Sequence, residues 1–166
     1  KIEAEKENGG KEFYILAKER FAKIQEKFKN AKIVSEMKGK YIIGKSYKPI
    51  FPYFVSREFP NKGNAWKIYG ADFVTTADGT GVVHIAPGYG EDDMNLAKKD
   101  KIPFIHHVGI DGKFTADVTD FSGILVKPKG DHQSSDILIL KYLAGNSLLF
   151  AKEKILHSYP HCYRCE

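Results

Sequence analysis

The apolar stretches of this chain are short, and glycine, proline or an Asp-Gly pair interrupts them at close intervals. Between residues 61 and 87, Gly63, Gly70 and the Asp78-Gly79 pair separate runs that have the composition of strands. Asp-Gly pairs favour tight hairpin turns, which join antiparallel strands. We therefore predict the α+β class, with a mainly antiparallel, barrel-like core and helices packed around it.

Three segments have helical character. Phe21, Ile24 and Phe28 recur at helical spacing after a short strand at 13–17, and we interpret them as core residues. The run EDDMNLAKKD places acids in its first turn and lysines in its last, which suits a helix dipole. The run SSDILILKYLAGN begins at a Ser/Asp cap and stops at Gly145.

Further strands are predicted outside these helices. One lies within 31–44, and a pair of strands within 102–115 turns around Asp111-Gly112. The aromatic stretch YKPIFPYF contains two prolines, which exclude a central strand or a helix interior. We expect this stretch to form an ordered loop or an edge segment.

Composition excludes several classes of protein. With 166 residues, 42% of them hydrophobic and 13% aromatic, the chain has enough apolar material for the core of one domain. No apolar run approaches the ~20 residues that a membrane-spanning helix needs. Two cysteines make no disulfide framework, so we expect a reducing, cytoplasmic setting. The net charge of +5 favours phosphate-rich partners, although spread-out lysines are equally compatible with solvated surface.

The stretch DGTGVVHIAPGYGEDD, residues 78–93, carries the strongest functional signal. His84 lies in a predicted strand, and Asp93 lies in the first turn of a predicted helix. In one interpretation His84 is a core residue and the acids only stabilise the helix start, by about 0.3–1 kcal/mol each. In the other, both side chains reach one pocket, where the Asp93 carboxylate holds the ammonium group of a ligand.

Part of this stretch, GTGVVHIAPGYGEDD, resembles the second signature of the editing domain of isoleucyl-tRNA synthetases, a large insertion in the core of class I synthetases. Related valyl enzymes usually carry Lys, and leucyl enzymes an apolar residue, where His84 stands. GKSYKPIFPYF and HSYPHCYRC resemble two further segments of the same family, in the same order. The resemblance extends from about Phe13 to the end of the chain.

The resemblance implies the editing-domain fold of class I synthetases for residues 1–156, with the N-terminal part of that domain missing. Residues 157–166 would be the segment that returns toward the catalytic core. The implied activity is post-transfer editing, in which the ester that joins valine to the isoleucine tRNA is hydrolysed. The chain would thus be part of an aminoacyl-tRNA ligase that also acts as an ester hydrolase.

By the family's pattern, Asp93 binds the α-ammonium group of the misattached amino acid. His84 lies at the floor of the pocket, either as a general base or as a group that positions the substrate. Glu91 and Asp92 are assigned to capping and surface. Water, rather than a covalent nucleophile, attacks the ester. The implied substrate-binding set is Thr80, Gly81, Val83, His84, Ala86, Pro87, Gly90 and Asp93.

The resemblance implies no cofactor for editing, whereas ATP and magnesium would serve only the catalytic core. Cys162 and Cys165 are either half of a zinc site in the full-length enzyme or a pair of free thiols. His157 and His161 are the additional candidate ligands within this chain.

The implied partners are the acceptor end of the isoleucine tRNA and the rest of the synthetase in cis, with a monomer and no membrane contact. Lys127 and Lys129 are candidates for tRNA contact. Adjacent His106 and His107 would face opposite sides of a strand, so they are assigned a structural or surface role.

One departure from the family pattern concerns the other wall of the pocket. In the family a threonine-rich strand followed by Pro-Trp forms that wall, and this sequence contains no such segment. We therefore expect weak or absent deacylation by this chain alone. Two alternatives stay open: a non-catalytic RNA-binding or interaction module with the same fold, and the editing domain of a valyl-type synthetase, which would cleave threonyl-tRNA.

Overall fold

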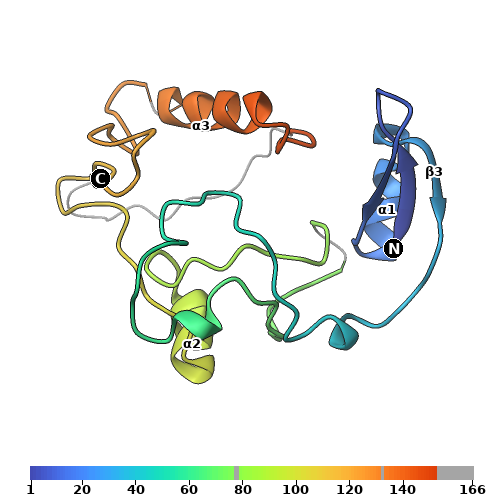
Figure 1. The fold of residues 1–166 in the computed structure, drawn as a ribbon, viewed down its shortest axis with the longest axis horizontal. Helices are drawn as coiled ribbons and strands as arrows, with labels where there is room; N and C mark the ends of the chain where they lie inside the picture. The colour runs from blue at the N-terminus through green and yellow to red at the C-terminus, as the bar shows by residue number, and fades with distance from the viewer. Residues whose placement is uncertain (77–78, 132, 153–166) are drawn as a thin grey trace. The chain divides into compact units, whose positions relative to one another are not determined.

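The structure, a computed structural model, describes residues 1–76, 79–131 and 133–152 (Figure 1). The chain divides into two compact units, Lys1–His106 and His107–Glu166, which are described separately below. No helix within the described ranges is both long enough and apolar enough to cross a membrane. The elements are β1 (Ile2–Glu5), β2 (Lys11–Tyr14), α1 (Lys18–Ile24), η1 (Gln25–Lys27), β3 (Lys29–Ile33), η2 (Gly39–Tyr41), η3 (Lys62–Asn64), α2 (Glu91–Asp100) and α3 (Ser134–Gly145).

The first unit contains a three-stranded antiparallel sheet in the order β2-β1-β3. In the central strand β1, Ile2 pairs with Tyr14 of β2 on one side and with Ile33 of β3 on the other. The sheet is open, because β2 and β3 are both edge strands within the part of the chain that the structure describes. The fold is therefore α+β as predicted. These residues form an open sheet, however, and not the predicted barrel-like core.

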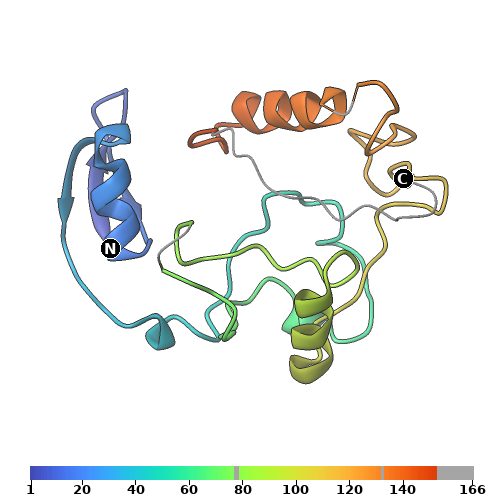
Figure 2. The same ribbon diagram turned by 180° about the vertical axis from the view of Figure 1, so that it is seen from behind.

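Helix α1 covers one face of this sheet (Figure 2). Ile2 and Ala4 of β1 and Phe21 and Ile24 of α1 are all buried. Phe28, which follows η1, packs its ring edge-on against Phe21 with 5.9 Å between the ring centroids. The predicted apolar stripe is thus confirmed as core, except that the helix ends before Phe28 because the backbone there is extended.

Between β3 and α2, the described residues form turns and loops, apart from η2, η3 and one β-bridge between Ser46 and Lys67. The strands predicted within 61–87 are wrong, since none of the described residues there belongs to a strand. Val82 and Val83 are 51% and 53% exposed. Their composition suits a strand, but a strand needs a pairing partner, and none lies beside them among the described residues.

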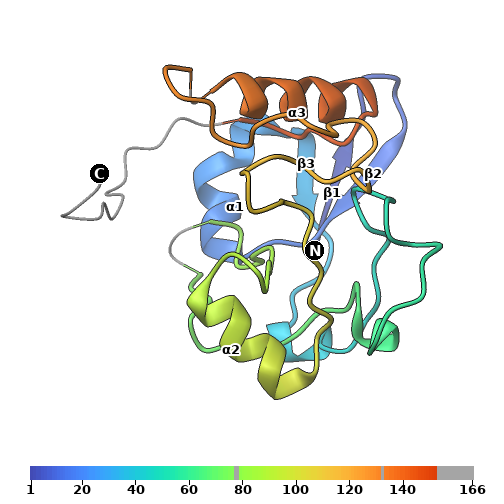
Figure 3. The ribbon, with the colours of Figure 1, turned by 90° about the vertical axis from the view of Figure 1, so that its left-hand side faces the viewer.

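Helix α2 occupies the range that its charge pattern predicts (Figure 3). Gly90 is its N-cap and has an extended backbone, and Leu96 and Ala97 are its buried residues. Lys101 is its C-cap, with a left-handed φ of 53°, and the backbone N–H of Lys101 donates to the carbonyl of Ala97. Acids in the first turn and lysines in the last stabilise both ends of the dipole.

The second unit packs a turn-rich segment against α3. The strand pair predicted around Gly112 is reduced to isolated bridges, one of them between Val108 and Phe114, although Gly112 has the expected positive φ of 73°. The ring of buried Phe121 lies 5.8 Å from that of Phe114 and 5.5 Å from that of Tyr142 in α3. These aromatic contacts form the small core of this unit.

Helix α3 begins after Gln133 without a side-chain cap, so the predicted Ser/Asp cap is wrong. The hydroxyl of Ser135, a residue only 2% exposed, instead donates to the carbonyl of Leu125. A buried hydroxyl needs such a partner, and this bond fixes the start of α3 to the preceding segment.

Candidate functional site

The Gly-Thr-Gly stretch of the signature is fixed to the start of α1. The backbone N–H of Ala17 donates to the carbonyl of Thr80 at 2.7 Å, and the Thr80 hydroxyl donates to the carbonyl of Val82 at 3.0 Å. Gly81 has a φ of 74°, and a Cβ placed there would lie 3.0 Å from the Cβ of Ala17. Both the backbone conformation and the close approach therefore require glycine at position 81.

Asp93 ties the signature loop to α2. Its Oδ1 accepts a hydrogen bond from the backbone N–H of Ala86 at 3.3 Å. The carbonyl of Ala86 in turn accepts from the N–H of Tyr89 at 2.9 Å, which closes a turn that includes Pro87. A Cβ at Gly90 would lie 2.1 Å from Asp93 Oδ2, so only glycine leaves the carboxylate in this position.

The Asp93 carboxylate keeps capacity for a further partner. It is partly exposed and has no ion-pair partner among the described residues. An ionised carboxylate offers about four lone-pair sites, and the Ala86 N–H occupies one of them. The start of a helix also stabilises negative charge. The group is therefore anchored and able to bind a cation such as an ammonium group.

His84 is exposed and lies in irregular backbone rather than in the predicted strand. Neither the hollow beside α2 nor the hollow beside β1 includes His84 or Asp93. A pocket that these two side chains share thus stays a prediction. Of the remaining predicted set, Val83 is exposed, whereas Ala86, Pro87 and Gly90 belong to the partly buried loop that Asp93 holds.

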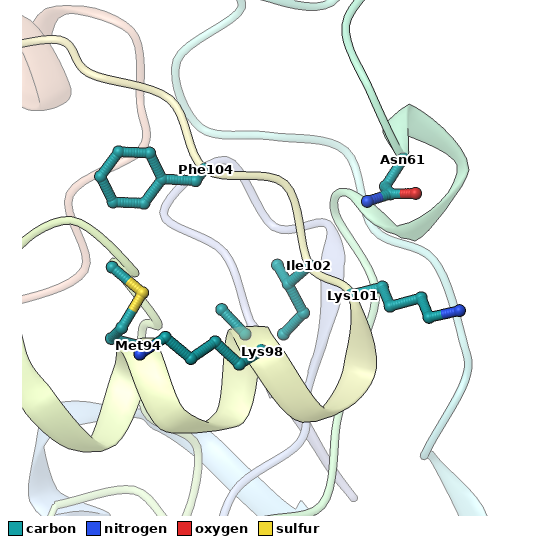
Figure 4. Close-up of a pocket in the computed structure, with 7 residues that line it drawn as sticks. Asn61, Met94, Lys98, Lys101, Ile102 and Phe104 are labelled. Carbon is teal, nitrogen blue, oxygen red and sulfur yellow. The ribbon is translucent and has the colours of Figure 1, made fainter.

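A hollow of about 370 Å³ lies beside α2, in a place that sequence reasoning missed (Figure 4). The sequence features that could have indicated this hollow are Lys98 and Lys101 at the end of α2 and the aromatic residue Phe104 that follows them. A Cβ at Gly88 would lie 3.4 Å from the ring of Phe104, so the signature loop passes close to one wall of the hollow. The lining residues are Asn61, Met94, Ala97, Lys98, Lys101, Ile102 and Phe104.

Comparison with known proteins assigns the chain to a family. No protein-family model matches it. It is, however, 41% identical to the isoleucine–tRNA ligase of Clostridium acetobutylicum over 155 residues, which cover 93% of this chain. It belongs to the isoleucyl-tRNA synthetase family. The ligase of Treponema denticola is 40% identical over 164 residues, and isoleucine–tRNA ligase 2 of Bacillus cereus is 41% identical over 154, each covering 92% of the chain. The chain spans about 14% of the length of these relatives.

In this isoleucyl-tRNA synthetase segment, residues 1–76, 79–131 and 133–152 contain no cluster of three or more metal-ligating side chains. Cys162 and Cys165, with His157 and His161, lie outside the described residues, so the zinc prediction stays a prediction. Lys127, one candidate for tRNA contact, lies 3.9 Å from the carboxylate of Asp136.

The adjacent histidines of the synthetase segment differ in environment. His106 is exposed, and its ring meets that of Phe104 edge-on with 4.6 Å between centroids. His107 is partly buried, and its carbonyl accepts a hydrogen bond from the N–H of Thr115 at 3.1 Å. Their surroundings are consistent with the structural or surface role assigned to them.

Proposed function

We propose that this chain is the part of an isoleucyl-tRNA synthetase that hydrolyses valine wrongly esterified to the isoleucine tRNA. A hydrophobic pocket separates isoleucine from valine by one methylene, worth only about 1–3 kcal/mol, a general value for which isoleucyl enzymes are themselves the standard example. A second, hydrolytic site that admits valine and excludes isoleucine by size removes the remaining errors. The resemblance of residues 79–93 to the editing signature supports the proposal that this chain carries that site.

The anchored but incompletely satisfied Asp93 carboxylate is the observation that carries the proposal. A valyl ester presents an α-ammonium group next to the scissile carbonyl, and a carboxylate binds such a group by a charge-assisted hydrogen bond. The contact with the Ala86 N–H fixes the direction of the carboxylate before the substrate arrives. The missing side chain at Gly90 leaves room for Oδ2 itself, because a Cβ there would lie 2.1 Å from that oxygen.

The other predicted residues have supporting roles in this proposal. Thr80 and Gly81, which are fixed to Ala17, form one wall of the site. The exposed His84 ring forms the floor, where it positions the ester or accepts a proton from the attacking water. Backbone groups and the terminal ribose hydroxyl of the tRNA orient that water.

The exposed apolar surface supports an assignment of the rest of the synthetase as a partner in cis. Among the described residues, 21 large hydrophobic side chains are exposed, against eight hydrophobic residues that are buried. Exposed apolar surface of this extent favours a covering partner. We propose that the edges of β2 and β3 continue into the barrel-like core of the editing domain. Cys162 and Cys165 would meet their other zinc ligands in the same partner.

The whole enzyme would act as an ATP-dependent isoleucine–tRNA ligase, and as a monomer that binds the acceptor end of the tRNA. The test is deacylation of valyl-tRNA and isoleucyl-tRNA by the synthetase that carries this segment. Asp93→Ala should slow valyl-tRNA hydrolysis by about 10²-fold or more, because it removes the charged partner of the substrate's ammonium group. Asp92→Ala, a neighbouring exposed acid in the same helical turn, is the matched control.

Three results would contradict this assignment. Full hydrolysis by the Asp93→Ala enzyme would show that Asp93 does not bind the ammonium group of the substrate. Cleavage of threonyl-tRNA in place of valyl-tRNA would indicate a valyl-type domain. Binding of tRNA without hydrolysis of either ester would indicate an RNA-binding module. The isolated chain is expected to hydrolyse valyl-tRNA weakly or not at all.

A further inference from the structure

The C-terminal end of α2 is held by a loop, residues 61–69, that is distant from it in the sequence. The side-chain amide of Asn64, the last residue of η3, donates to the carbonyl of Asp100 at 3.3 Å and to that of Lys101 at 3.2 Å. The last carbonyls of a helix have no partners within the helix, so such groups need donors from elsewhere. The two N–H groups of one side-chain amide can supply both bonds.

Neighbouring residues fix the position of Asn64 itself. The hydroxyl of Tyr69 donates to the backbone carbonyl of Asn64 at 2.7 Å, and the N–H of Asn64 donates to the carbonyl of Asn61 at 2.8 Å. Burial, and then the nearby Asp100 carboxylate, raise the pKa of Tyr69 above its usual value of 10, so its hydroxyl remains a donor at neutral pH. Asn64 is thus held on both sides before it reaches α2.

The backbone of this loop is left-handed on both sides of Asn64. Asn61 has a φ of 59°, which asparagine tolerates, but Trp66 has a φ of 51°, which is unfavourable for a bulky side chain. Such a conformation persists only where the surroundings impose it. Here the Trp66 carbonyl accepts from the N–H of Tyr47 at 2.8 Å, and its ring meets that of Phe59 edge-on. The loop therefore has one defined conformation, which presents Asn64 to the helix.

Packing alone does not fix this end of α2. The hollow of about 370 Å³ is lined by Asn61 from the loop and by Lys101 from the end of the helix, so the two elements are not closely packed there (Figure 4). Leu96 and Ala97 are the buried residues of α2. Their burial is non-directional and does not set the axial position of the helix. The directional bonds from Asn64 can set that position.

We propose that Asn64 is a positioning residue for the Asp93 carboxylate and acts through α2. The inference rests on the proposed function, in which Asp93 binds the ammonium group of the valyl ester. The 10 residues of α2 span about 15 Å, and a short helix moves as one body. At the other end, Asp93 Oδ1 accepts from the N–H of Ala86 at 3.3 Å, a long bond that a small shift of the helix would break.

Deacylation of valyl-tRNA by the synthetase that carries this segment tests the inference. Asn64→Ala should lower kcat about tenfold, because a displaced carboxylate no longer orients the ester. KM should change less than about twofold, since other contacts with the tRNA hold the substrate. Asn64→Asp keeps the shape of the side chain but has no N–H to donate, so it should lower kcat at least as much. Tyr69→Phe removes only the hydroxyl that holds Asn64 and should lower kcat about threefold.

Asn146→Ala is the matched control. Asn146 is the C-cap of α3, and its side-chain amide donates to the carbonyl of Tyr142 at 2.9 Å. The substitution therefore removes the same kind of bond from a helix end in the other unit. Urea unfolding should show similar losses of stability for Asn64→Ala and Asn146→Ala, whereas kcat of the Asn146→Ala synthetase should stay within about twofold of the parent value.

Hydrogen exchange gives a measurement that does not require hydrolysis. In the Asn64→Ala synthetase, mass spectrometry should show about tenfold faster exchange in peptides that contain the Ala86 amide, because Asp93 no longer accepts from it. In the Asn146→Ala synthetase the same peptides should exchange at the parent rate. A residue that only stabilises the end of α2 would leave the exchange of this distant loop unchanged.

The inference is overturned if the Asn64→Ala synthetase keeps the parent kcat, if Asn146→Ala lowers kcat as much, or if exchange at Ala86 is the same in the parent and Asn64→Ala enzymes. Loss of hydrolysis in Asp93→Ala together with full hydrolysis in Asn64→Ala would reject the positioning role alone. Full hydrolysis in Asp93→Ala together with faster exchange in Asn64→Ala would reject the editing proposal and support the connection between Asn64 and the carboxylate.

Discussion

The sheet region, residues 1–33, and the signature region, residues 79–101, are stabilised in different ways. In the sheet region, strands pair along their length and Phe21 and Ile24 bury apolar surface against β1. In the signature region, a few specific contacts hold the irregular backbone that precedes α2, and Val82 and Val83 remain exposed. Burial, which is non-directional, fixes the scaffold, whereas hydrogen bonds and glycine conformations fix the candidate site.

This difference suits a site that must accept a substrate. The polar groups of the signature region are held in place but can still bind a ligand. The Asp93 carboxylate accepts from one backbone donor, and the His84 ring is exposed. Low burial also lets such a region move at little cost in free energy. The comparison predicts that substitutions in the sheet region lower the free energy of unfolding most. Substitutions in the signature region should mainly change the position of the loop and of the Asp93 carboxylate.

The largest effect on stability should come from the core of the sheet region. Phe21→Ala removes a buried ring that packs against Phe28, and such changes cost about 3–5 kcal/mol. Val82→Ala removes exposed methyl groups and should stay within about 0.5 kcal/mol. Urea unfolding followed by circular dichroism gives both free energies. Equal losses would show that the signature region has a core of its own.

The contact between the two regions is tested by a pair of glycines in the signature. Gly81→Ala should cost about 2–3 kcal/mol, since φ is 74° and the new Cβ would lie 3.0 Å from that of Ala17. Gly79→Ala has a similar φ of 67° but meets no described atom within 4 Å, so it should cost only about 1–2 kcal/mol. The difference between the two unfolding free energies measures how firmly the loop is fixed to α1. No difference would mean that the loop detaches from Ala17 in solution.

Local patterns predicted the helices well. The charge pattern of residues 91–100 predicted α2, and the glycine at 145 predicted the end of α3. These signals act within one or two turns of a helix, so no knowledge of the rest of the fold is needed. Strands are different, because their pairing partners lie elsewhere. The apolar stretch at 82–86 looks like a strand, yet no partner pairs with it among the described residues.

The candidate site shows the same division. The sequence predicted Asp93 as a site residue through a family pattern, and it placed Gly81 in the same predicted set. It did not reveal that the approaching residue is Ala17, or that Asp93 accepts from the backbone of Ala86, because both contacts depend on the path of the loop. The hollow was missed for the same reason, since Asn61 reaches it from a distant part of the sequence.

A smaller effect is expected where the loop joins α2. Gly90→Ala would place a Cβ 2.1 Å from Asp93 Oδ2, so the carboxylate must swing away and release the Ala86 N–H. One hydrogen bond of this kind contributes about 1 kcal/mol. Gly88→Ala, which meets the ring of Phe104 at 3.4 Å, is the matched control and should leave the bond intact. Hydrogen exchange of the Ala86 amide should accelerate in the first variant only; unchanged exchange would show that another group holds the loop.

The smallest effect concerns the charged face of the sheet. The pKa of Glu3 is lowered from 4.5, first by its hydrogen bond with Lys11 and then by that with Lys32, each at an N–O distance of 3.2 Å. Folding therefore favours the ionised form of the Glu3 carboxyl group. Its contribution to the free energy of unfolding is complete above about pH 4.5 and is lost as the pH falls through the lower pKa of the folded state.

Glu3→Gln should accordingly flatten the decline in stability between pH 4.5 and more acidic values, as measured by urea unfolding at a series of pH values. Glu7→Gln is the matched control, because Glu7 is exposed in the turn after β1 and makes no ion pair among the described residues. Added salt should reduce the difference between the two variants, since the Lys11 and Lys32 ammonium groups are largely solvated. An identical pH profile for both variants would show that the ladder of charges across β2, β1 and β3 adds nothing to the sheet, and that burial of its other face against α1 is sufficient to hold the scaffold together.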